Sequence, residues 1–537
     1  MRNLSNWKVR IAGIILVLAT FWYLPWVYVN LNWAAPWLAL PFAFAVTFAA
    51  LLMLIAVVTN WRSQVPVERR APTGEEPEVL VVIPTHGEPP AMIYETARSV
   101  LEQDYPIEKI KLVISDDSHR LSVRGVVEHL RREYPDARLA YHEPPRHGDP
   151  KRRGDGKAGN LNSVLDAINR YVPQIAFIET RDADDLVGDP TFLRQTIGQL
   201  LANPRVAFVQ TIKQARVSPS DPFGNLEPLF YRRLMLSKNA TNSVFPCGSG
   251  VVWRRIALND IGGFPVWNLV EDLQSGVEAL RRGWRGLYLP IVGAIAQTAP
   301  EDIPNLFKQR GTWAIDTLRL MFWGDKRGLN LLQRLSFLEI GLFYLLSLPM
   351  LVFTLVPVIS LGFDIYPIYS TPIEYALHLW PYVAAMELTL VALAEGLRYE
   401  DLWRFREMMI GMAPVYLKAL WITLRYGPRR KPAYRVTRKE HIHTLYWREI
   451  WLQNVLLLAL VVASIYHLAM HSVLRSADLG SLFWAAFFIL ALSRIVRNAW
   501  HGVNFRTMLK ELYRGFGRSA VLRGLAKLFV ITSSLWR

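Results

Sequence analysis

Long apolar runs occur toward both ends of the chain and frame a stretch with a different pattern. A helix needs about 20 consecutive apolar residues to cross a bilayer. Six segments are near this length, at about 11–29, 35–58, 336–361, 375–394, 450–470 and 480–495. Two others, 303–323 and 401–426, mix charged with apolar positions and predict amphipathic helices lying on the membrane surface.

Between the second and third predicted spans the pattern is that of an α/β domain. Short β-branched apolar runs at 79–83, 111–115 and 175–178 predict buried strands, and 91–101 predicts a helix between the first two. Acidic residues follow the second and third runs directly. Such alternation predicts an open, Rossmann-like sheet whose ligand lies beyond the carboxyl ends of the strands.

Composition and charge place the chain in a membrane. The sequence is 52% hydrophobic with 19 Trp, which excludes an ordinary soluble enzyme, and its formal charge is +16. The basic residues lie beside the spans, which favours a lipid bilayer as partner over nucleic acid. The outer connections 30–33 and 362–374 lack Lys and Arg, so we expect both termini and the α/β domain to be cytoplasmic. The single cysteine, Cys247, excludes an internal disulfide.

A carboxylate pair, Glu271-Asp272, begins a predicted helix that ends at Arg281-Arg282-Gly283. The helix dipole favours the ionised form of acidic residues at this position. An ionised carboxylate can take a proton from a hydroxyl group as a general base. The alternative interpretation is that both residues only cap the helix.

Three other clusters have the residue types of a nucleotide site. Asp182-Ala183-Asp184 follows a strand, and its carboxylates could hold a hard cation against a diphosphate. Asp116-Asp117 could bind a nucleoside or form a turn. The glycine-rich basic stretch 151–162, which contains Lys157, could cradle phosphates or be a solvated loop.

Three further features could serve an acceptor or a channel. The small residues around Cys247-Gly248-Ser249 allow close approach to the backbone, or form a tight loop. Gln309 and Trp313 could bind a sugar ring, although Trp also anchors helices at membrane interfaces. Glu387 lies inside the fourth span, where it could line a channel or pair with another span.

In this order, these motifs resemble those of the bacterial processive family-2 glycosyltransferases. That group includes cellulose synthase, curdlan (β-1,3-glucan) synthase and, more distantly, hyaluronan and chitin synthases. Beyond the motifs above, the resemblance includes Pro84-Thr85-His86-Gly87-Glu88 and the stretch Tyr434–Lys439, which is similar to a gating loop over the bound nucleotide. The resemblance spans Val79 to about Lys439 and implies a GT-A fold for the cytosolic domain.

The resemblance assigns roles to these residues. Asp272, beside Glu271, becomes the general base, and Asp182 and Asp184 become the ligands of Mg²⁺ or Mn²⁺. The implied nucleotide-binding residues are Thr85, Glu88, Asp116, Asp117, Lys157, Asp182, Thr437 and Lys439. The implied acceptor-binding residues are Cys247, Gly248, Ser249, Gln309 and Trp313. The implied reaction is an inverting, processive polymerisation of glucose from UDP-glucose. The growing glucan chain would be exported through the spans of this bacterial inner-membrane protein. Periplasmic accessory subunits could assist the export.

The sequence departs from the family at several positions. Thr312 stands where the family usually has an Arg that faces the diphosphate, and Arg310, Lys157, Arg438 or Lys439 could supply that charge instead. Val270 replaces a Thr. The tail is too short for the cyclic-nucleotide-sensing β-barrel of many cellulose synthases. The Val270 change is minor, whereas Thr312 and the short tail favour a β-1,3-glucan product. The alternatives are a β-1,4-glucan synthase, a non-processive transferase acting on a lipid carrier, and a transporter with a nucleotide-sensing domain.

We therefore expect an α/β GT-A-type domain inserted in an all-α membrane domain of about six helices. The expected parts are two spans (1–60), the cytosolic domain (61–300), an interfacial helix with the Gln309 and Trp313 motif (301–330), spans 3 and 4 (331–400), an interfacial helix and gating loop (401–449), spans 5 and 6 (450–496) and a basic tail (497–537).

Overall fold

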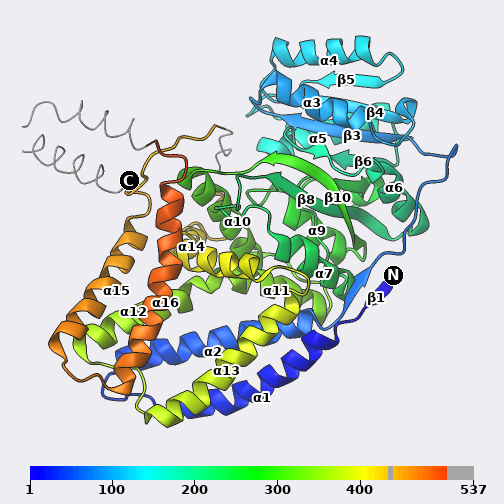
Figure 1. Cartoon of the computed structure of the whole chain (residues 1–537). Helices are drawn as coiled ribbons and strands as arrows, with labels where there is room; N and C mark the ends of the chain where they lie inside the picture. Colours follow the sequence, from blue (N-terminus) through cyan, green and yellow to red (C-terminus); the bar gives the residue numbers. More distant parts are fainter. Residues whose placement is uncertain (433–439, 505–537) are drawn as a thin grey trace, which may run out of the picture.

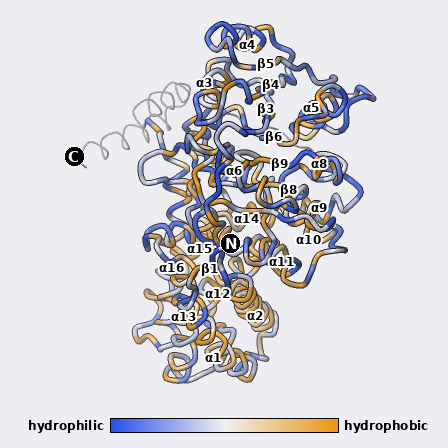
Figure 2. The backbone as a smooth tube through the Cα atoms, turned by 90° about the vertical axis from the view of Figure 1, so that its right-hand side faces the viewer, coloured by the Kyte–Doolittle hydropathy of each residue, from blue (hydrophilic) through white to orange (hydrophobic). Residues whose placement is uncertain are grey.

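A computed structural model describes residues 1–432 and 440–504 and shows a sheet domain joined to a group of long helices (Figure 1). Hydrophobic residues gather along the long helices, whereas the sheet domain is mixed in character (Figure 2). The chain enters the sheet domain after two N-terminal helices and leaves it through the remaining long helices. The predicted insertion of an α/β domain into a helical domain is therefore confirmed.

Eight strands form one mixed sheet in the order β5-β4-β3-β6-β9-β8-β10-β7. The strands are β3 (Val79–Thr85), β4 (Ile110–Asp116), β5 (Arg138–His142), β6 (Phe177–Thr180), β7 (Leu186–Val187), β8 (Val206–Arg216), β9 (Val251–Arg254) and β10 (Arg285–Thr298). The four strands from β5 to β6 are parallel, but β9 runs antiparallel to both of its neighbours, and β7 runs antiparallel to β10. The three predicted strands are confirmed.

Helices cover both faces of this sheet. On one face lie α3 (Pro90–Leu101), α4 (Leu121–Glu133) and α6 (Phe192–Ala202); on the other lie α5 (Gly156–Tyr171), α7 (Met235–Thr241), α8 (Arg255–Asp260) and α9 (Asp272–Arg281). In β3, Val79, Val81 and Ile83 pack toward α3 and α4, while Leu80 and Val82 pack toward α5 and α9. This alternation, with every residue buried, explains why the strand is a continuous apolar run.

Seven helical segments are long and apolar enough to cross a membrane, judged by length and composition over the described residues. They are α1 (Trp7–Val29), α2 (Pro36–Thr59), α11 (Leu331–Leu345) continued by α12 (Ser347–Phe363), α13 (Pro372–Leu393), α14 (Tyr399–Tyr426), α15 (Trp451–Met470) and α16 (Ser476–Ala499). Six correspond to the predicted spans. The seventh, α14, is the segment expected to lie at the interface; it packs against α10 (Ile303–Trp323), the other segment of that kind.

Polar contacts hold the sheet domain over the long helices. Lys238 of α7 donates to Glu339 of α11 (2.8 Å), and Thr59 at the end of α2 donates to the same carboxylate. A short sheet of β1 (Arg2–Leu4) and β2 (Ser63–Val65) joins the two ends of the α1–α2 pair. At the opposite end of the helices, Leu31 pairs with Ile368. We call the connections 30–35, 364–371 and 471–475 the outer end.

Candidate active site

A cavity of about 2370 Å³ extends from the sheet to the outer end. Its upper wall comes from the ends of β3, β6 and β8 and from the start of α9. Its middle wall comes from α10, α11 and α14, and its lower wall includes Tyr366, Pro367 and Arg475 of the outer connections. The cavity therefore joins the acidic clusters of the sheet to the far end of the apolar helices.

Two lysines connect the acidic clusters at the upper end of the cavity. Lys157 Nζ lies 2.6 Å from Asp182 Oδ1 and 3.4 Å from Glu271 Oε1. Lys213 Nζ lies 3.2 Å from the other oxygen of Asp182 and 3.5 Å from Asp185. The predicted meeting of the carboxylates after β6 with those at the start of α9 is thus present, with an ammonium group between them.

Opposing charges set the protonation of these groups. Burial alone would lower the pKa of Lys157, but the carboxylates of Asp182 and Glu271 outweigh burial and the pKa is raised. The same balance, with Asp185 and Asp182 as the partners, raises the pKa of Lys213. Both lysines therefore stay positively charged beside Asp182.

Asp272 lies at the first position of α9, as the sequence predicts, but its electrostatics differ from the prediction. Burial, and next the Glu271 carboxylate, raise the pKa of Asp272 to about 6. The Leu273 amide, Lys157 and Lys213 act in the opposite direction and do not compensate. The sequence predicts that the helix dipole holds Asp272 ionised. This expectation is corrected, because desolvation and the like charge of Glu271 raise the pKa of Asp272.

The turns after β3 and β4 form another part of the upper wall. Asp117 is held by Arg152, whose two terminal nitrogens lie 2.5 and 3.0 Å from its oxygens, and His147 lies 3.2 Å away. Thr85, Glu88 and Asp117 line the cavity. Asp116 is fully buried behind the wall, where it accepts hydrogen bonds from Thr85 Oγ1 and from the backbone of Ser118 and Arg120. Asp116 therefore shapes the turn that presents Asp117.

The acceptor residues predicted from the Cys247 loop occupy two different positions. Cys247 and Gly248 line the cavity, and their carbonyl oxygens accept hydrogen bonds from Lys213 and Lys157. Gly248 has φ +83°, and an added Cβ would lie 3.4 Å from Asp272 Oδ2, so the open backbone faces the Asp272 carboxylate. Ser249 is fully buried instead, and its hydroxyl accepts a hydrogen bond from the backbone N–H of Asp182.

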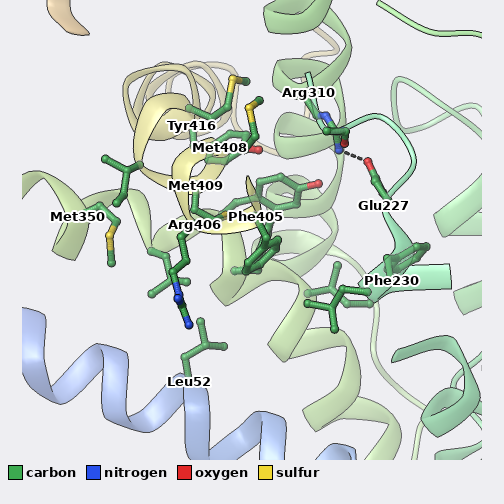
Figure 3. A pocket seen from close by; sticks show the side chains of 18 of the residues that line it. Leu52, Glu227, Phe230, Arg310, Met350, Phe405, Arg406, Met408, Met409 and Tyr416 are labelled. Carbon is green, nitrogen blue, oxygen red and sulfur yellow. Dashed lines mark hydrogen bonds and ion pairs between the residues drawn. The ribbon is translucent and has the colours of Figure 1, made fainter. Parts of the chain in front are cut away.

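On α10, Gln309, Thr312 and Trp313 line the cavity. Arg310 pairs with Glu227 (Figure 3) and lies 4.9 Å from the centre of the Trp313 ring. These contacts engage the charge of Arg310, so Lys157 and the unpredicted Lys213 are the cations beside Asp182. The remaining candidates for the missing charge are Arg438 and Lys439, and the remaining predicted nucleotide contacts are Thr437 and Lys439. All three residues lie outside the described part of the chain.

A second residue that sequence reasoning missed holds the loop before α9. Asp316, fully buried on α10, accepts hydrogen bonds from the backbone N–H groups of Leu269 (2.7 Å) and Val270 (3.1 Å). Its carbonyl oxygen accepts a hydrogen bond from Asn268 (2.9 Å). The sequence signal for Asp316 is weak, because one acidic residue in an amphipathic helix is normally solvated.

Glu387 of α13 lines the cavity and pairs with Arg406 of α14. Figure 3 shows Arg406 reaching from α14 toward Leu52 of α2. Arg406 also lies over the Tyr399 ring, 5.6 Å from its centre. Both predicted readings of Glu387, a position facing the cavity and a partnership with another helix, are thus present in the structure.

Comparisons with known proteins agree with this geometry. Residues 77–315 match the family described as glycosyltransferase like family 2, and residues 259–424 match the cellulose synthase family. Cellulose synthase 2 of Novacetimonas hansenii is 27% identical over 84% of this chain and 27% of its own length. The UDP-forming cellulose synthase catalytic subunit of Pseudomonas fluorescens is 28% identical over 70% of this chain and 50% of its own length. The chain thus spans half or less of the length of these relatives.

The fold has a solved counterpart. A mannosyltransferase from Pyrobaculum calidifontis, solved with GDP-Man and Mn²⁺, superposes with a TM-score of 0.51 at 18% identity, covering 72% of this chain and 99% of its own. At this identity the likeness concerns the fold alone, and it confirms the GT-A-like glycosyltransferase fold. In its motifs, its fold and its two family matches, the chain is similar to the family-2 glycosyltransferases of the cellulose synthase type.

Proposed function

We propose that the chain is a processive, inverting β-glucan synthase of a bacterial inner membrane that takes glucose from UDP-glucose and passes the growing polymer through its own helices. The observation that carries this proposal is the continuous cavity, which begins at the cluster of Asp182, Lys157 and Asp272 and ends at Tyr366 and Arg475. A non-processive transferase would need the upper part of this cavity but not the lower part.

The donor diphosphate would lie between the carboxylates after β6 and the two lysines. Asp182 and Asp184 supply the oxygen donors that Mg²⁺ and Mn²⁺ prefer, so the residues fit a divalent cation. Both oxygens of Asp182 contact lysine ammonium groups here, and those lysines would turn toward the phosphates when the cation is bound. A bound cation would supply charge stabilisation for the departing UDP. Asp117, held by Arg152, would recognise the nucleoside.

Asp272 would take the proton from the acceptor hydroxyl as that oxygen attacks the anomeric carbon. The new carbon–oxygen bond forms while the bond to UDP breaks, so one displacement inverts the configuration. Lys157 and Lys213 stabilise the charge that develops on the leaving diphosphate. The cavity-facing ring of Trp313 would hold the terminal sugar of the acceptor beside the open backbone at Gly248.

The raised pKa of Asp272 predicts the pH dependence of transfer. A general base acts only when ionised, so kcat/KM should be retained above pH 6 and fall about tenfold per unit below it, with an apparent pKa near 6. Glu271→Gln removes the neighbouring carboxylate that raises this pKa and should move the acid limb to lower pH. The measurement is the pH profile of UDP release for both proteins. A wild-type limb near the ordinary aspartate value, or an unchanged limb in the variant, would contradict this assignment.

The lower cavity is suited to sugar rings, because aromatic side chains offer apolar faces that grip no single register. Its lining includes Tyr344, Phe353, Tyr382, Phe405, Trp484 and Phe487. The Glu387–Arg406 pair lies in the same lining, where the positive charge of Arg406 compensates the negative charge of Glu387. We propose that the polymer passes this pair on its way to the outer end.

Glu387→Leu would leave Arg406 without its carboxylate in a confined passage. We expect the yield of long polymer to fall about tenfold, a cost of about 1.4 kcal/mol, while UDP binding is unchanged. Removing both charges in Glu387→Leu/Arg406→Leu should restore part of the yield. Product length and amount in proteoliposomes are the readout, with Glu400→Leu on the exposed first turn of α14 as the control. Export that is unchanged in Glu387→Leu would remove the channel role.

The linkage is the finer part of the proposal. The relatives named above are cellulose synthases, which supports a β-1,4 product and lends no support to the β-1,3 preference drawn from Thr312 and the short tail. Purified proteoliposomes incubated with UDP-glucose and Mg²⁺ or Mn²⁺, followed by digestion with β-1,4- and β-1,3-specific glucanases, distinguish the two products. Absence of any polymer, with UDP released only onto a lipid acceptor, would refute a processive synthase.

A further inference from the structure

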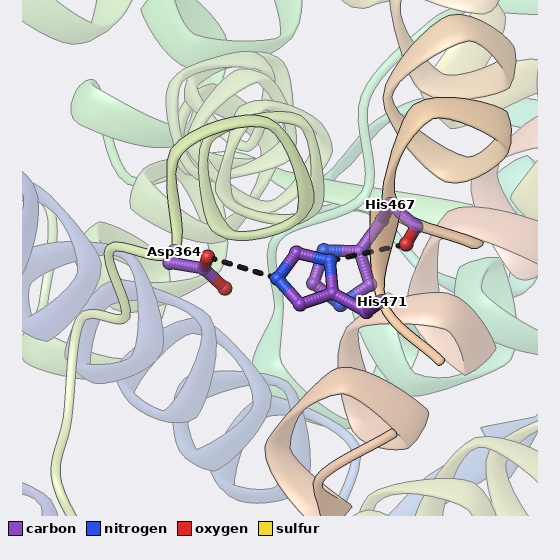
Figure 4. A group of neighbouring side chains, drawn as sticks. All are labelled: Asp364, His467 and His471. Atoms are coloured by element: carbon purple, nitrogen blue, oxygen red, sulfur yellow. Dashed lines mark hydrogen bonds and ion pairs between the residues drawn. The ribbon is translucent and has the colours of Figure 1, made fainter. Parts of the chain in front are cut away.

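Beyond the proposed synthase activity, two histidines and an aspartate meet at the outer end, far from the carboxylates of the sheet. His467 and His471 lie one turn apart at the end of α15, and their rings stack with centres 4.2 Å apart. Asp364 ends α12 beside them (Figure 4). One ligand atom from each residue lies within 4.8 Å of the other two.

Backbone contacts fix which nitrogen of each ring carries the proton. His467 Nδ1 lies 3.0 Å from the Leu361 carbonyl oxygen, and His471 Nδ1 lies 3.1 Å from the His467 carbonyl oxygen. A carbonyl oxygen only accepts, so each Nδ1 must donate, and each Nε2 of a neutral ring presents a lone pair. This orientation of histidine by a second hydrogen bond is the usual arrangement at metal sites.

Both Nε2 atoms face carboxylate oxygens. His471 Nε2 lies 3.3 Å from Asp364 Oδ2. His467 Nε2 is fully buried, has no hydrogen-bond partner among the described residues, and lies 3.4 Å from Asp478 Oδ1. A lone pair facing an anionic oxygen is unfavourable unless a proton or a metal cation lies between them. Arg475 contacts Asp364 through Oδ1, which leaves Oδ2 directed at His471.

We propose that Asp364, His467 and His471 form a binding site for a divalent transition metal of the Zn²⁺ type. Two imidazoles and one carboxylate suit Zn²⁺ better than Mg²⁺ or Ca²⁺, which prefer oxygen ligands. His471 and Asp364 are partly exposed, so the fourth position is open to water. Ligands about 2.1 Å from a tetrahedral ion lie about 3.4 Å apart, so binding draws ligand atoms that are up to 4.8 Å apart together by as much as about 1.4 Å. The ion would join α12 to α15 beside Tyr366 and Arg475, which line the lower end of the cavity.

The test is Zn²⁺ binding by the full chain in lipid nanodiscs, purified with a tag that contains no histidine and stripped with a chelator. Saturating Mg²⁺ occupies the carboxylate cluster of the sheet. We expect one Zn²⁺ per chain, and a loss of affinity of at least about 100-fold in both His467→Gln and His471→Gln, since loss of even an outer-shell partner costs about 10–100-fold. His378→Gln, which removes a histidine at the outer end of α13, is the matched control and should bind normally.

Thermal unfolding separates binding from folding. Zn²⁺ should raise the unfolding temperature of the wild type and of His378→Gln, but not that of the two site variants, which should match the wild type without Zn²⁺. If His467→Gln does not fold, Asp364→Asn and His471→Gln, at partly exposed positions, carry the test. The proposal is overturned if the wild type binds no Zn²⁺, if His471→Gln binds as tightly as the wild type, or if Asp182→Asn alone removes the bound ion. UDP release by the wild type shows separately whether the proposed synthase is active.

Discussion

Replacing Asp272 by Asn is expected to lower glucosyl transfer at least about 10³-fold, within the range of a lost general base. The side chain keeps its volume but can no longer take the acceptor proton. Lys157, Lys213 and Asp182 remain in place, so UDP affinity should change less than about twofold. Single-turnover transfer from UDP-glucose and UDP binding by calorimetry, both at pH 8, measure the two effects.

A control on the same helix tests whether this loss is specific. Glu278→Gln also converts a carboxylate to an amide on α9, but Glu278 pairs with Arg281 at the other end of the helix. It should transfer at nearly the wild-type rate. Simultaneous loss of transfer and UDP binding in Asp272→Asn would instead assign Asp272 a structural role.

The same variant has an expected effect on stability with a definite sign. Because the pKa of Asp272 is raised in the folded chain, its ionisation above about pH 6 costs the folded state free energy, whereas well below that pH it costs nothing. Asp272→Asn should therefore unfold at a higher temperature than the wild type at pH 8, with the difference disappearing near pH 4. A variant that is less stable at pH 8 would argue against the raised pKa.

Replacing Asp182 by Asn should give the second largest effect, of a different kind. The substitution removes the charge that both Lys157 and Lys213 contact, and with it a carboxylate that suits a divalent cation. We expect transfer to fall about 10²–10³-fold, as for loss of several kcal/mol of charge stabilisation. In Asp182→Asn, UDP affinity should also no longer depend on Mg²⁺ or Mn²⁺. In Asp272→Asn, that dependence should remain.

Titration of UDP at a series of cation concentrations distinguishes the two variants. Asp136→Asn, in the exposed turn before β5, is the matched control and should bind and transfer normally. Cation-dependent UDP binding that survives in Asp182→Asn would exclude this carboxylate from the cation site.

Local patterns were sufficient to predict most elements. The amphipathic segment 303–323 coincides with α10, and β3 begins at Val79 with the apolar run. Both were predictable because the periodicity of a helix or strand depends only on residues close together in the sequence. The strand order was not predictable in this way. The antiparallel strand β9 lies between β6 and β8, and this placement depends on contacts between segments far apart in the chain.

The same distinction between local pattern and long-range contact applies to the residues of the candidate site. Asp182, Asp272 and Lys157 were predicted because motifs mark them, and the structure joins them through one ammonium group. Lys213 was missed because a lysine near the end of an apolar strand normally reaches solvent, and only the fold turns it toward Asp182. The raised pKa of Asp272 depends on burial, which the sequence of α9 alone does not reveal.

The hydrogen bonds of Asp316 have a consequence for dissecting this protein. Three of them, together with one from Arg319 to Asn268, bind residues 268–270 to α10 rather than to the sheet. The loop that leads into Asp272 is therefore held from outside the α/β unit. Expression of residues 61–300 as a soluble fragment would remove that attachment, and the fragment would lose the fixed position of Asp272.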